Sequence, residues 1–404
     1  MKSRRLVVVG TVASSPYAGM AWMHMQIAAG LLRLGHDVYY IESTSTWPYD
    51  PTRRSKVNDS DYAVPYLARV AEDFGLGDRW AFRRSYSDKQ WFGMSRTKAE
   101  ELLEHSAAVF NVAGATRLEE EGLHVGRLVY FGTDPVYHEI AFAKDDEDVR
   151  TIIEEHHDTV TYGENIGNPN CPIPPLPRLR ARTRQPVLLD FWGDAGPGRE
   201  EFTTVGNWKQ EGRDIEFHGE TYHWSKHHEF LKYVDLPRRT NVPIELAMGL
   251  ADAAVTHPGL GDLIPAVGMT AEERILLASN GWKLVNAHPF TTDPWSYRDY
   301  IVSSKGEFSV AKDQNVRLQS GWFSERSACY LAAGRPVVTQ DTGFGTVLPT
   351  GEGLFSFQTM DDILSAFDAI HSDYGRHRRA AREIAEEYFR AEKVLAKMLE
   401  DLGI

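Results

Sequence analysis

Apolar positions along the chain switch between the spacing of buried strands and that of helices. Leu6–Val9 is a short, continuous apolar run, typical of a strand that is buried on both faces. Beyond a loop rich in Ser, Pro and Gly, apolar residues recur at helical spacing over residues 20–34, and Gly35 ends that helix. Val38–Ile41 then predicts a second strand. Strand, loop, helix and strand in this order indicate a doubly wound α/β domain with a parallel sheet.

The same pattern continues through the first half of the chain. Residues 109–112 and 128–131 predict further strands, and the second is followed by Asp134 at its carboxyl end. Parallel sheets expose functional groups at that end, although an Asp before Pro is also an ordinary turn former. The charged stretch 145–158 predicts a solvent-exposed helix, whose two adjacent histidines face different directions and so do not suggest a metal site.

The second half begins with a change in composition. Residues 171–186 are rich in proline and arginine and predict a stiff connector between two domains. After residue 361 the pattern is helical, and a long final helix either caps its own domain or packs on the first. We therefore predict domains at residues 1–175 and 176–385, followed by a helix at 386–404 that packs on the first domain. Other strand patterns lie at residues 186–192, 203–209, 215–226 and 282–285, with a helix at 272–278.

Candidate chemistry concentrates in residues 320–345. Ser324 is a good N-cap for a helix that runs to about residue 333, and a short strand and the loop Asp341-Thr342-Gly343 follow. A glycine-containing loop that feeds a helix N-terminus suits a phosphate or diphosphate, because unpaired N–H groups and the helix dipole favour an anion there. Arg326 and Ser327 lie in that first turn. An arginine there opposes the helix dipole but favours an anion, and the simple alternative is a pair with Glu325 or another neighbour.

Several stretches resemble GT-B glycosyltransferases of the family-4-like type. The run SERSACYLAAGRPVVTQDTG, which begins at Ser324, resembles their donor-binding helix and following strand, in which E-A-x-x-x-G-x-P-V-V precedes a small loop. The run IVSSKGEFSVAK resembles their P-S-x-x-E-G-F-G loop, which implies that Glu307 contacts the donor sugar. Leu32–Val38 resembles the L-x-x-x-G-H-D-V segment of the N-terminal domain. Cys329 stands where many retaining members have a second glutamate, so the stereochemical outcome stays open.

The resemblance implies a fold and an activity. We expect two Rossmann-like doubly wound domains that face a cleft, with a C-terminal helix that can cross back to the first domain. We expect metal-independent transfer of a hexosyl group from a UDP- or dTDP-sugar to a small-molecule acceptor, with no cofactor. The expected donor contacts are Lys226, Ser324, Arg326, Ser327, Asp341, Thr342 and Gly343.

The resemblance also implies a base from the N-terminal domain. Asp134 ranks first, His24 second and His138 third, because in inverting members a carboxylate or histidine of that domain deprotonates the acceptor. His24 lies near apolar positions of its helix, so a core histidine is the alternative. For Lys226, the alternative to a donor contact is an ordinary exposed lysine.

Composition limits the classes that remain. The chain has 404 residues, a formal net charge of −13 and two widely separated cysteines. The charge argues against a nucleic-acid partner, and no apolar run is long enough for a membrane helix. With no secretory signal pattern, we expect a cytoplasmic protein.

Three other functions stay open. A dinucleotide fingerprint is absent, although Glu42 could mimic the acid that binds an NAD ribose. A non-hydrolysing sugar-nucleotide epimerase would use the same architecture without an acceptor. A nucleotide-sugar-binding protein without catalysis would bind the donor and nothing more.

Overall fold

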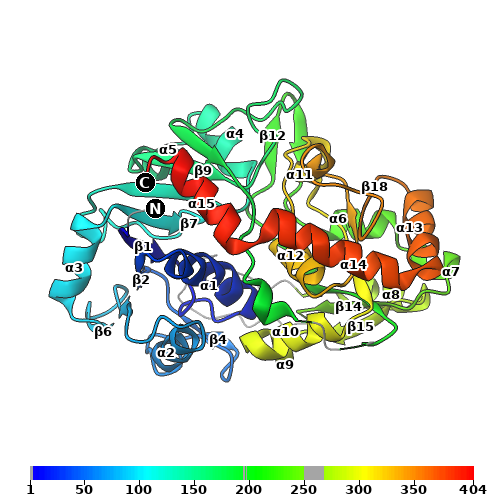
Figure 1. Ribbon diagram of the computed structural model, residues 1–404, viewed down its shortest axis with the longest axis horizontal. Coiled ribbons are helices and arrows are strands. Elements are labelled where there is room, and N and C mark those ends of the chain that lie inside the picture. Colours follow the sequence, from blue (N-terminus) through cyan, green and yellow to red (C-terminus); the bar gives the residue numbers. More distant parts are fainter. Residues whose placement is uncertain (1–2, 194–195, 197, 250–267) are drawn as a thin grey trace.

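The computed structural model describes residues 3–193, 196, 198–249 and 268–404, and it contains two open β-sheets flanked by helices (Figure 1). The first sheet has the order β10-β9-β8-β7-β1-β2-β5-β6, and its strands are parallel except for β6, which pairs antiparallel with β5. The strands are β1 (Arg5–Val9), β2 (Asp37–Ser43), β5 (Trp80–Arg83), β6 (Trp91–Gly93), β7 (Ala108–Val112), β8 (Leu128–Gly132), β9 (Asp158–Thr161) and β10 (Leu179–Arg182).

Helices cover this sheet because its central strands are buried on both faces. β7 and β8 are buried at every position, as parallel strands with helices on both faces are. The helices are α1 (Ala18–Arg33), α2 (Ala63–Asp73), α3 (Arg96–His105), α4 (Tyr137–Ala143) and α5 (Glu147–Glu154), and a short hairpin joins β3 (Tyr49–Asp50) to β4 (Ser55–Lys56).

The second sheet has the order β15-β14-β11-β16-β17-β18 and is parallel throughout. Its strands are β11 (Phe202–Gly206), β14 (Ile244–Met248), β15 (Lys283–Asn286), β16 (Gly306–Ser309), β17 (Val337–Gln340) and β18 (Leu354–Phe357). A separate hairpin joins β12 (Ile215–Phe217) to β13 (Glu220–Tyr222). The helices that follow are α6 (His227–Lys232), α7 (Leu236–Arg239), α8 (Ala271–Ser279), α9 (His288–Thr291), α10 (Pro294–Ser303), α11 (Asp313–Arg317), α12 (Glu325–Ala332), α13 (Met360–Ser372), α14 (Tyr374–Ile384) and α15 (Ala391–Asp401). Two parallel α/β sheets confirm the predicted fold class.

The expected connector at residues 171–186 is not simply an extended linker. Its residues 179–182 form β10, which pairs with β9, so the first sheet continues beyond the boundary expected at residue 175. Arginines at alternate positions of β10 point away from the core, and only Ala181 of that strand is buried. An edge strand of this kind pairs through its backbone and has little apolar pattern to reveal it.

The strand expected at residues 186–192 is wrong. Leu189–Trp192 is a single 3-10 turn, η1, and it packs into an aromatic group that joins the two halves of the chain. The ring centroid of Trp22 in α1 lies 4.6 Å from that of Trp192, and its Nε1 donates to the Pro294 carbonyl of α10 at 2.9 Å. Burial of large aromatic side chains outweighs the strand propensity of this segment.

The final helical region returns to the first sheet, as expected. It is broken by a π-helical turn, η3 (Ala385–Phe389), after which α15 packs on α1 (Figure 1). The two helices approach at Gly30, where an added Cβ would lie 2.5 Å from Leu395 Cδ1. Arg127 Nη2 also donates to the Leu402 carbonyl at 2.8 Å. These contacts confirm that the C-terminal helix crosses back.

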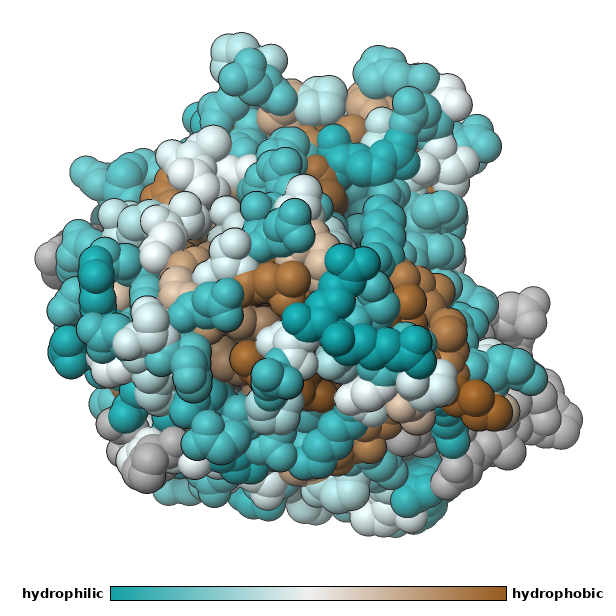
Figure 2. Space-filling view, turned by 90° about the vertical axis from the view of Figure 1, so that its right-hand side faces the viewer, coloured by the Kyte–Doolittle hydropathy of each residue, from teal (hydrophilic) through white to brown (hydrophobic). Residues whose placement is uncertain are grey.

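The surface is mixed in character. On the face in Figure 2, hydrophobic residues are scattered among hydrophilic ones. Within the described part of the chain, the strongly exposed large hydrophobic residues are Tyr17, Ile275 and Leu276. No helix in that part combines the length and apolar character needed to span a bilayer.

Candidate active site

The carboxyl ends of the two sheets meet where β8 and β9 face β16 and β17. Trp322 Nε1 donates to the carbonyl of Thr133, which follows β8, at 3.1 Å. Asn165 Nδ2 donates to the carbonyl of Gly343, which follows β17, at 3.0 Å. Ligands of open α/β sheets bind at this edge, so the junction is the candidate active site.

Five charged residues gather at this junction, and we call them the junction cluster: Asp134, Lys226, Glu307, Lys312 and Arg326. Lys312 Nζ pairs with Asp134 Oδ2 and lies 2.9 Å from the ring centroid of Trp224. Lys226 Nζ lies 5.6 Å from the ring centroid of Trp322. Because three cations face two carboxylates, the cluster favours an anionic ligand.

Arg326 is held firmly within this cluster. Its Nε donates to Glu307 Oε1 at 2.6 Å, its Nη1 to the Val205 carbonyl at 2.7 Å and its Nη2 to Ser309 Oγ at 2.7 Å. The pair that the sequence suggested with Glu325 is therefore replaced by a pair with Glu307. A guanidinium has five N–H groups, so two remain for a ligand.

Glu307 lies elsewhere than its motif implied. It is inside β16 and fully buried, whereas the loop that feeds α12 is formed by residues 318–324. Its Oε2 has no hydrogen-bond partner within the described residues, so a donor contact through that atom stays a prediction.

Lys226 has no ion-pair or hydrogen-bond partner for its ammonium group in the part of the chain that the structure describes. Burial, and then the nearby charges of Arg326 and Lys312, lower the pKa of Lys226 to about 7. Burial also lowers the pKa of Lys312 to about 8, against the opposing effect of Asp134. An added anion would relieve the repulsion among these three cations.

The first turn of α12 supplies further donors. Ser324 is the N-cap residue, but its side chain caps no backbone N–H, so the expected hydroxyl cap is wrong. Ser327 Oγ is buried and has no partner among the described residues. The first-turn N–H groups of a helix have no partner within the helix itself, and an anion can take that place.

The loop after β17 makes hydrogen bonds mainly within itself and to neighbouring parts of the protein. Asp341 Oδ1 accepts from Gly343 N at 2.8 Å, and Asp341 Oδ2 accepts from Gln358 Nε2 at 2.8 Å. Thr342 Oγ1 donates to the Trp322 carbonyl. Gly343 adopts a φ of 85°, which glycine accepts without strain. These bonds hold Trp322 against the junction, and a direct donor contact by this loop stays a prediction.

Comparison with known proteins was informative at the level of structure. No family model and no curated protein matches the chain. Sucrose-phosphate synthase from Thermosynechococcus elongatus matches with a TM-score of 0.56 at 14% identity, over 98% of each chain. An alpha-glucosyltransferase in complex with UDP and DNA matches with a TM-score of 0.57 at 10% identity, over 100% of each chain. Anabaena Alr3699/HepE in complex with UDP-glucose matches with a TM-score of 0.55 at 9% identity, over 99% of each chain.

The chain has the GT-B fold.

Within this GT-B fold, the two histidine candidates are both buried. His24 is fully buried, its Nδ1 lies 2.7 Å from the Met20 carbonyl, and its ring fills the space beside Gly10. Burial lowers the pKa of His24 to about 4. His138 contacts the Tyr130 hydroxyl, and burial likewise lowers the pKa of His138 to about 4. A catalytic role for either stays a prediction, ranked behind Asp134.

Glu42 has a structural role in the GT-B fold. Its carboxylate accepts hydrogen bonds from Ala13 N, Ser14 N, Ser14 Oγ and the Tyr40 hydroxyl, at 2.5 to 3.0 Å. Since these bonds occupy both oxygens, Glu42 holds the loop after β1 and is not placed to bind a ribose. The alternative function of NAD binding therefore lacks the acidic residue that the sequence offered for the ribose.

Lys312, Trp224 and Trp322 were not among the expected site residues. Lys312 is the third residue after β16, so the rule that selected Asp134 at the end of β8 would also have selected Lys312. The two tryptophans had no such signal, because a ring that contacts an ammonium group looks like any other aromatic residue in sequence.

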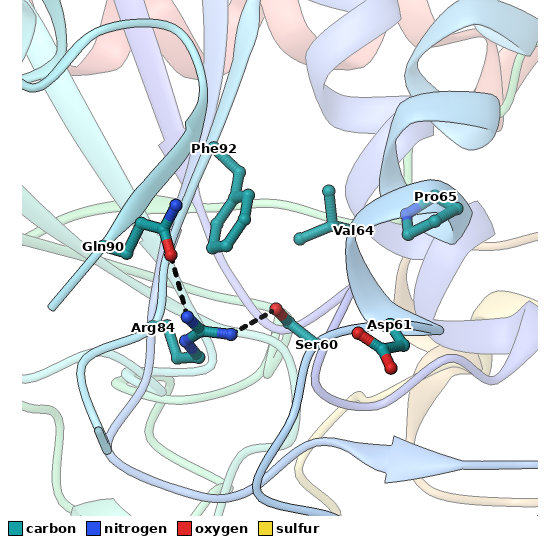
Figure 3. Close-up of a pocket in the computed structure, with 7 residues that line it drawn as sticks. All are labelled: Ser60, Asp61, Val64, Pro65, Arg84, Gln90 and Phe92. Carbon is teal, nitrogen blue, oxygen red and sulfur yellow. Dashed lines mark hydrogen bonds between the residues drawn. The ribbon is translucent and has the colours of Figure 1, made fainter. Parts of the chain in front are cut away.

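Two open pockets lie outside the junction cluster. One, of about 470 Å³, lies between the end of β5 and the start of α2, where Arg84 donates to Gln90 Oε1 at 2.8 Å and to Ser60 Oγ at 3.2 Å (Figure 3). The other, of about 560 Å³, is lined by Lys209, Ser225, His227 and His228, and the last three lie within two residues of Lys226 in the sequence. Within the described residues no group of His, Cys, Asp and Glu is arranged to hold a metal ion.

Proposed function

We propose that the protein is a glycosyltransferase that moves a hexosyl group from a UDP- or dTDP-sugar to a small-molecule acceptor without a metal ion. The observation that carries the proposal is the ammonium of Lys226, which has no ion pair or hydrogen bond within the described residues and lies beside Arg326 and Lys312, at the sheet edge where α12 begins. The structural neighbours include proteins in complex with UDP or UDP-glucose, which supports a nucleotide-sugar donor.

The diphosphate of the donor would lie at the N-terminus of α12. Lys226, the Ser327 hydroxyl and the two remaining N–H groups of Arg326 would contact its oxygens. As the bond between the anomeric carbon and the phosphate oxygen breaks, the electron pair leaves with the nucleoside diphosphate. Cations already held in place stabilise that charge without rearrangement.

The acceptor would approach from the side of the first sheet. In an inverting reaction, Asp134 takes the proton of the acceptor hydroxyl while that oxygen forms the new bond to the anomeric carbon. Asp134 Oδ2 pairs with Lys312, but Oδ1 is buried and has no partner among the described residues, so it is the atom for this role. His24 remains the second choice.

The acceptor and location belong to the proposal as well. One neighbour was crystallised with DNA, but a net charge of −13 disfavours a nucleic-acid acceptor here. We propose a cytoplasmic setting, supported by two cysteines that are both free and buried.

A thermal-shift panel with UDP, dTDP, GDP, ADP and NAD, without added metal, tests the donor site. A ligand at about 100 times its dissociation constant adds about 2.7 kcal/mol of stability, which is a readily measured shift. Stabilisation by one nucleoside diphosphate then selects the sugar nucleotide for transfer assays. Stabilisation by NAD alone would overturn the proposal.

Donor turnover separates the remaining alternatives. A glycosyltransferase releases nucleoside diphosphate faster when a suitable acceptor is added, whereas an epimerase changes the donor sugar with no acceptor present. A protein that only binds the donor shows neither reaction.

A further inference from the structure

The turn that carries Asp134 contains a residue in an unfavourable backbone conformation. This turn, residues 133–137, joins β8 to α4, and Val136 in it has φ 99° and ψ −58°. A β-branched residue at positive φ is a genuine outlier, since its Cβ crowds the backbone. Glycine would adopt this conformation freely, yet the chain has valine here.

Two contacts hold Val136 in place. Its side chain is fully buried in a hydrophobic cluster with Tyr130, Ile140 and Ile166. Its N–H donates to Glu139 Oε2 at 2.8 Å, and Glu139 is itself only 3% exposed. A strained residue persists only where its surroundings force the conformation, and such residues cluster at functional sites.

Ordinary helix capping does not explain this arrangement. In α13, Asp362 accepts from the N-cap N–H of Thr359 at 2.8 Å, and in α8, Glu273 accepts from that of Thr270 at 2.9 Å. Those N-cap residues have φ of −124° and −67°, so the same capping contact forms without positive φ. Helix capping alone therefore does not account for the conformation of Val136.

The conformation of Val136 sets the direction of the turn that follows β8. The turn brings Asp134 to Lys312 and the Thr133 carbonyl to Trp322, and Arg213 lies 5.6 Å from the ring centroid of Tyr137. Residues on both sides of the strained position thus meet the second half of the chain. Asp134 Oδ1 is left buried without a partner in the described structure.

We propose that Glu139 is a positioning residue for the transfer reaction. By holding Val136 at positive φ, Glu139 fixes Asp134 against Lys312 and directs Asp134 Oδ1 to the acceptor. This inference rests on the proposed function. It assigns Glu139 no contact with substrate.

The test compares Glu139→Ala and Glu139→Gln with Asp362→Ala, which removes the same kind of cap away from the junction. We expect Glu139→Ala to lower kcat by about 10- to 100-fold, because misplacement of a base is costly, while the dissociation constant of the donor changes less than about twofold. Glu139→Gln should retain kcat within about threefold, since its amide oxygen still accepts the Val136 N–H. Asp362→Ala should lower stability and leave kcat unchanged.

A background variant isolates the route through Asp134. In the Asp134→Asn protein, Glu139→Ala should cause no further loss of kcat, because residues that act as a unit are not additive. An equal loss in both backgrounds, or a loss from Glu139→Ala no greater than that from Asp362→Ala, would overturn the inference.

A second measurement needs no turnover and so separates this inference from the proposed function. Urea unfolding of Asp134→Asn, Lys312→Met and the double variant gives their free energies of unfolding, and the double-mutant cycle gives the coupling energy between Asp134 and Lys312. We expect that coupling to fall by about half or more in the Glu139→Ala protein. A coupling that is unchanged would overturn the positioning role even if transfer activity is never found.

Discussion

Lys226 makes donor affinity depend on pH in a way that a permanent cation would not. Its ammonium makes no ion pair or hydrogen bond in the described structure, and burial beside Arg326 and Lys312 lowers the pKa of Lys226 to about 7. A diphosphate favours the protonated form, so we expect affinity to strengthen as the pH falls. The perturbations are Lys226→Met, which removes the charge, and Lys226→Arg, which keeps it at every pH tested.

The magnitude follows from the titration. With a pKa of about 7, Lys226 is about nine-tenths protonated at pH 6 and about one-tenth at pH 8, which predicts about tenfold tighter binding at the lower pH. A hydrogen bond to a charged group contributes about 1.5–3 kcal/mol, so Lys226→Met should weaken binding at pH 6 by roughly 10- to 150-fold. At pH 9 the variant and the wild type should bind alike.

The assay is isothermal titration calorimetry with an intact UDP-sugar from pH 6 to pH 9, without metal. Both phosphates of such a donor are diesters of constant charge, so the phosphates do not contribute to the pH dependence. The matched variant Lys226→Arg keeps its charge, so its affinity should change less across this range than that of the wild type, and the slope that remains comes from Lys312, whose pKa is lowered to about 8. A flat profile in the wild type, or the same slope in Lys226→Arg, would refute the assignment.

The same shift affects stability in the absence of ligand. Because the pKa of Lys226 is lowered from 10.5 to about 7, the unfolded chain binds more protons than the folded chain between these values. The contribution of Lys226 to the free energy of unfolding should therefore rise with pH from about 7 to 10.5, and Lys226→Met should remove that slope. Urea unfolding across this range measures it.

Three further predictions follow from buried contacts. Asp134→Asn should lower kcat about 100-fold or more with donor affinity unchanged, measured by steady-state kinetics and calorimetry, and undiminished turnover would exclude Asp134 as the base. Arg326→Ala leaves Glu307 buried without its counter-charge and should cost about 3–5 kcal/mol in urea unfolding, whereas a loss below about 1 kcal/mol would contradict a buried pair. Gly30→Val should clash with Leu395 and lower the free energy of unfolding by about 1–3 kcal/mol, measured by thermal unfolding. The control is Gly19→Ala in the same helix, whose added Cβ meets nothing closer than 4.0 Å and should leave stability unchanged. Equal stability of the two variants would mean that α15 does not pack at Gly30.

Sequence by itself determined the elements whose signals are local. The apolar run before residue 10 and the helical stripe after it became β1 and α1, within a few residues of the expected limits. The segment around Ser324 became α12 followed by β17, because an N-cap, a glycine stop and a β-branched run are each encoded by neighbouring residues. The place of Asp134 just after β8 follows from the same local logic, since it is the polar residue at the end of an apolar strand, and its role as the base stays a prediction.

Tertiary structure alone decided which distant groups meet. Glu307 and Arg326 are both charged residues in apolar surroundings, and only the alignment of β16 beside α12 shows that they neutralise each other. Lys312 and Asp134 lie 178 residues apart, so no periodicity joins them, and the strained turn at Val136 exists because packing and the Glu139 contact outweigh the preference of valine. The π-helical turn before Arg390 likewise lets α15 reach α1, where Gly30 leaves room for it. Local patterns report the preferences of neighbouring residues, whereas a site between two sheets depends on contacts that form only when both sheets are assembled.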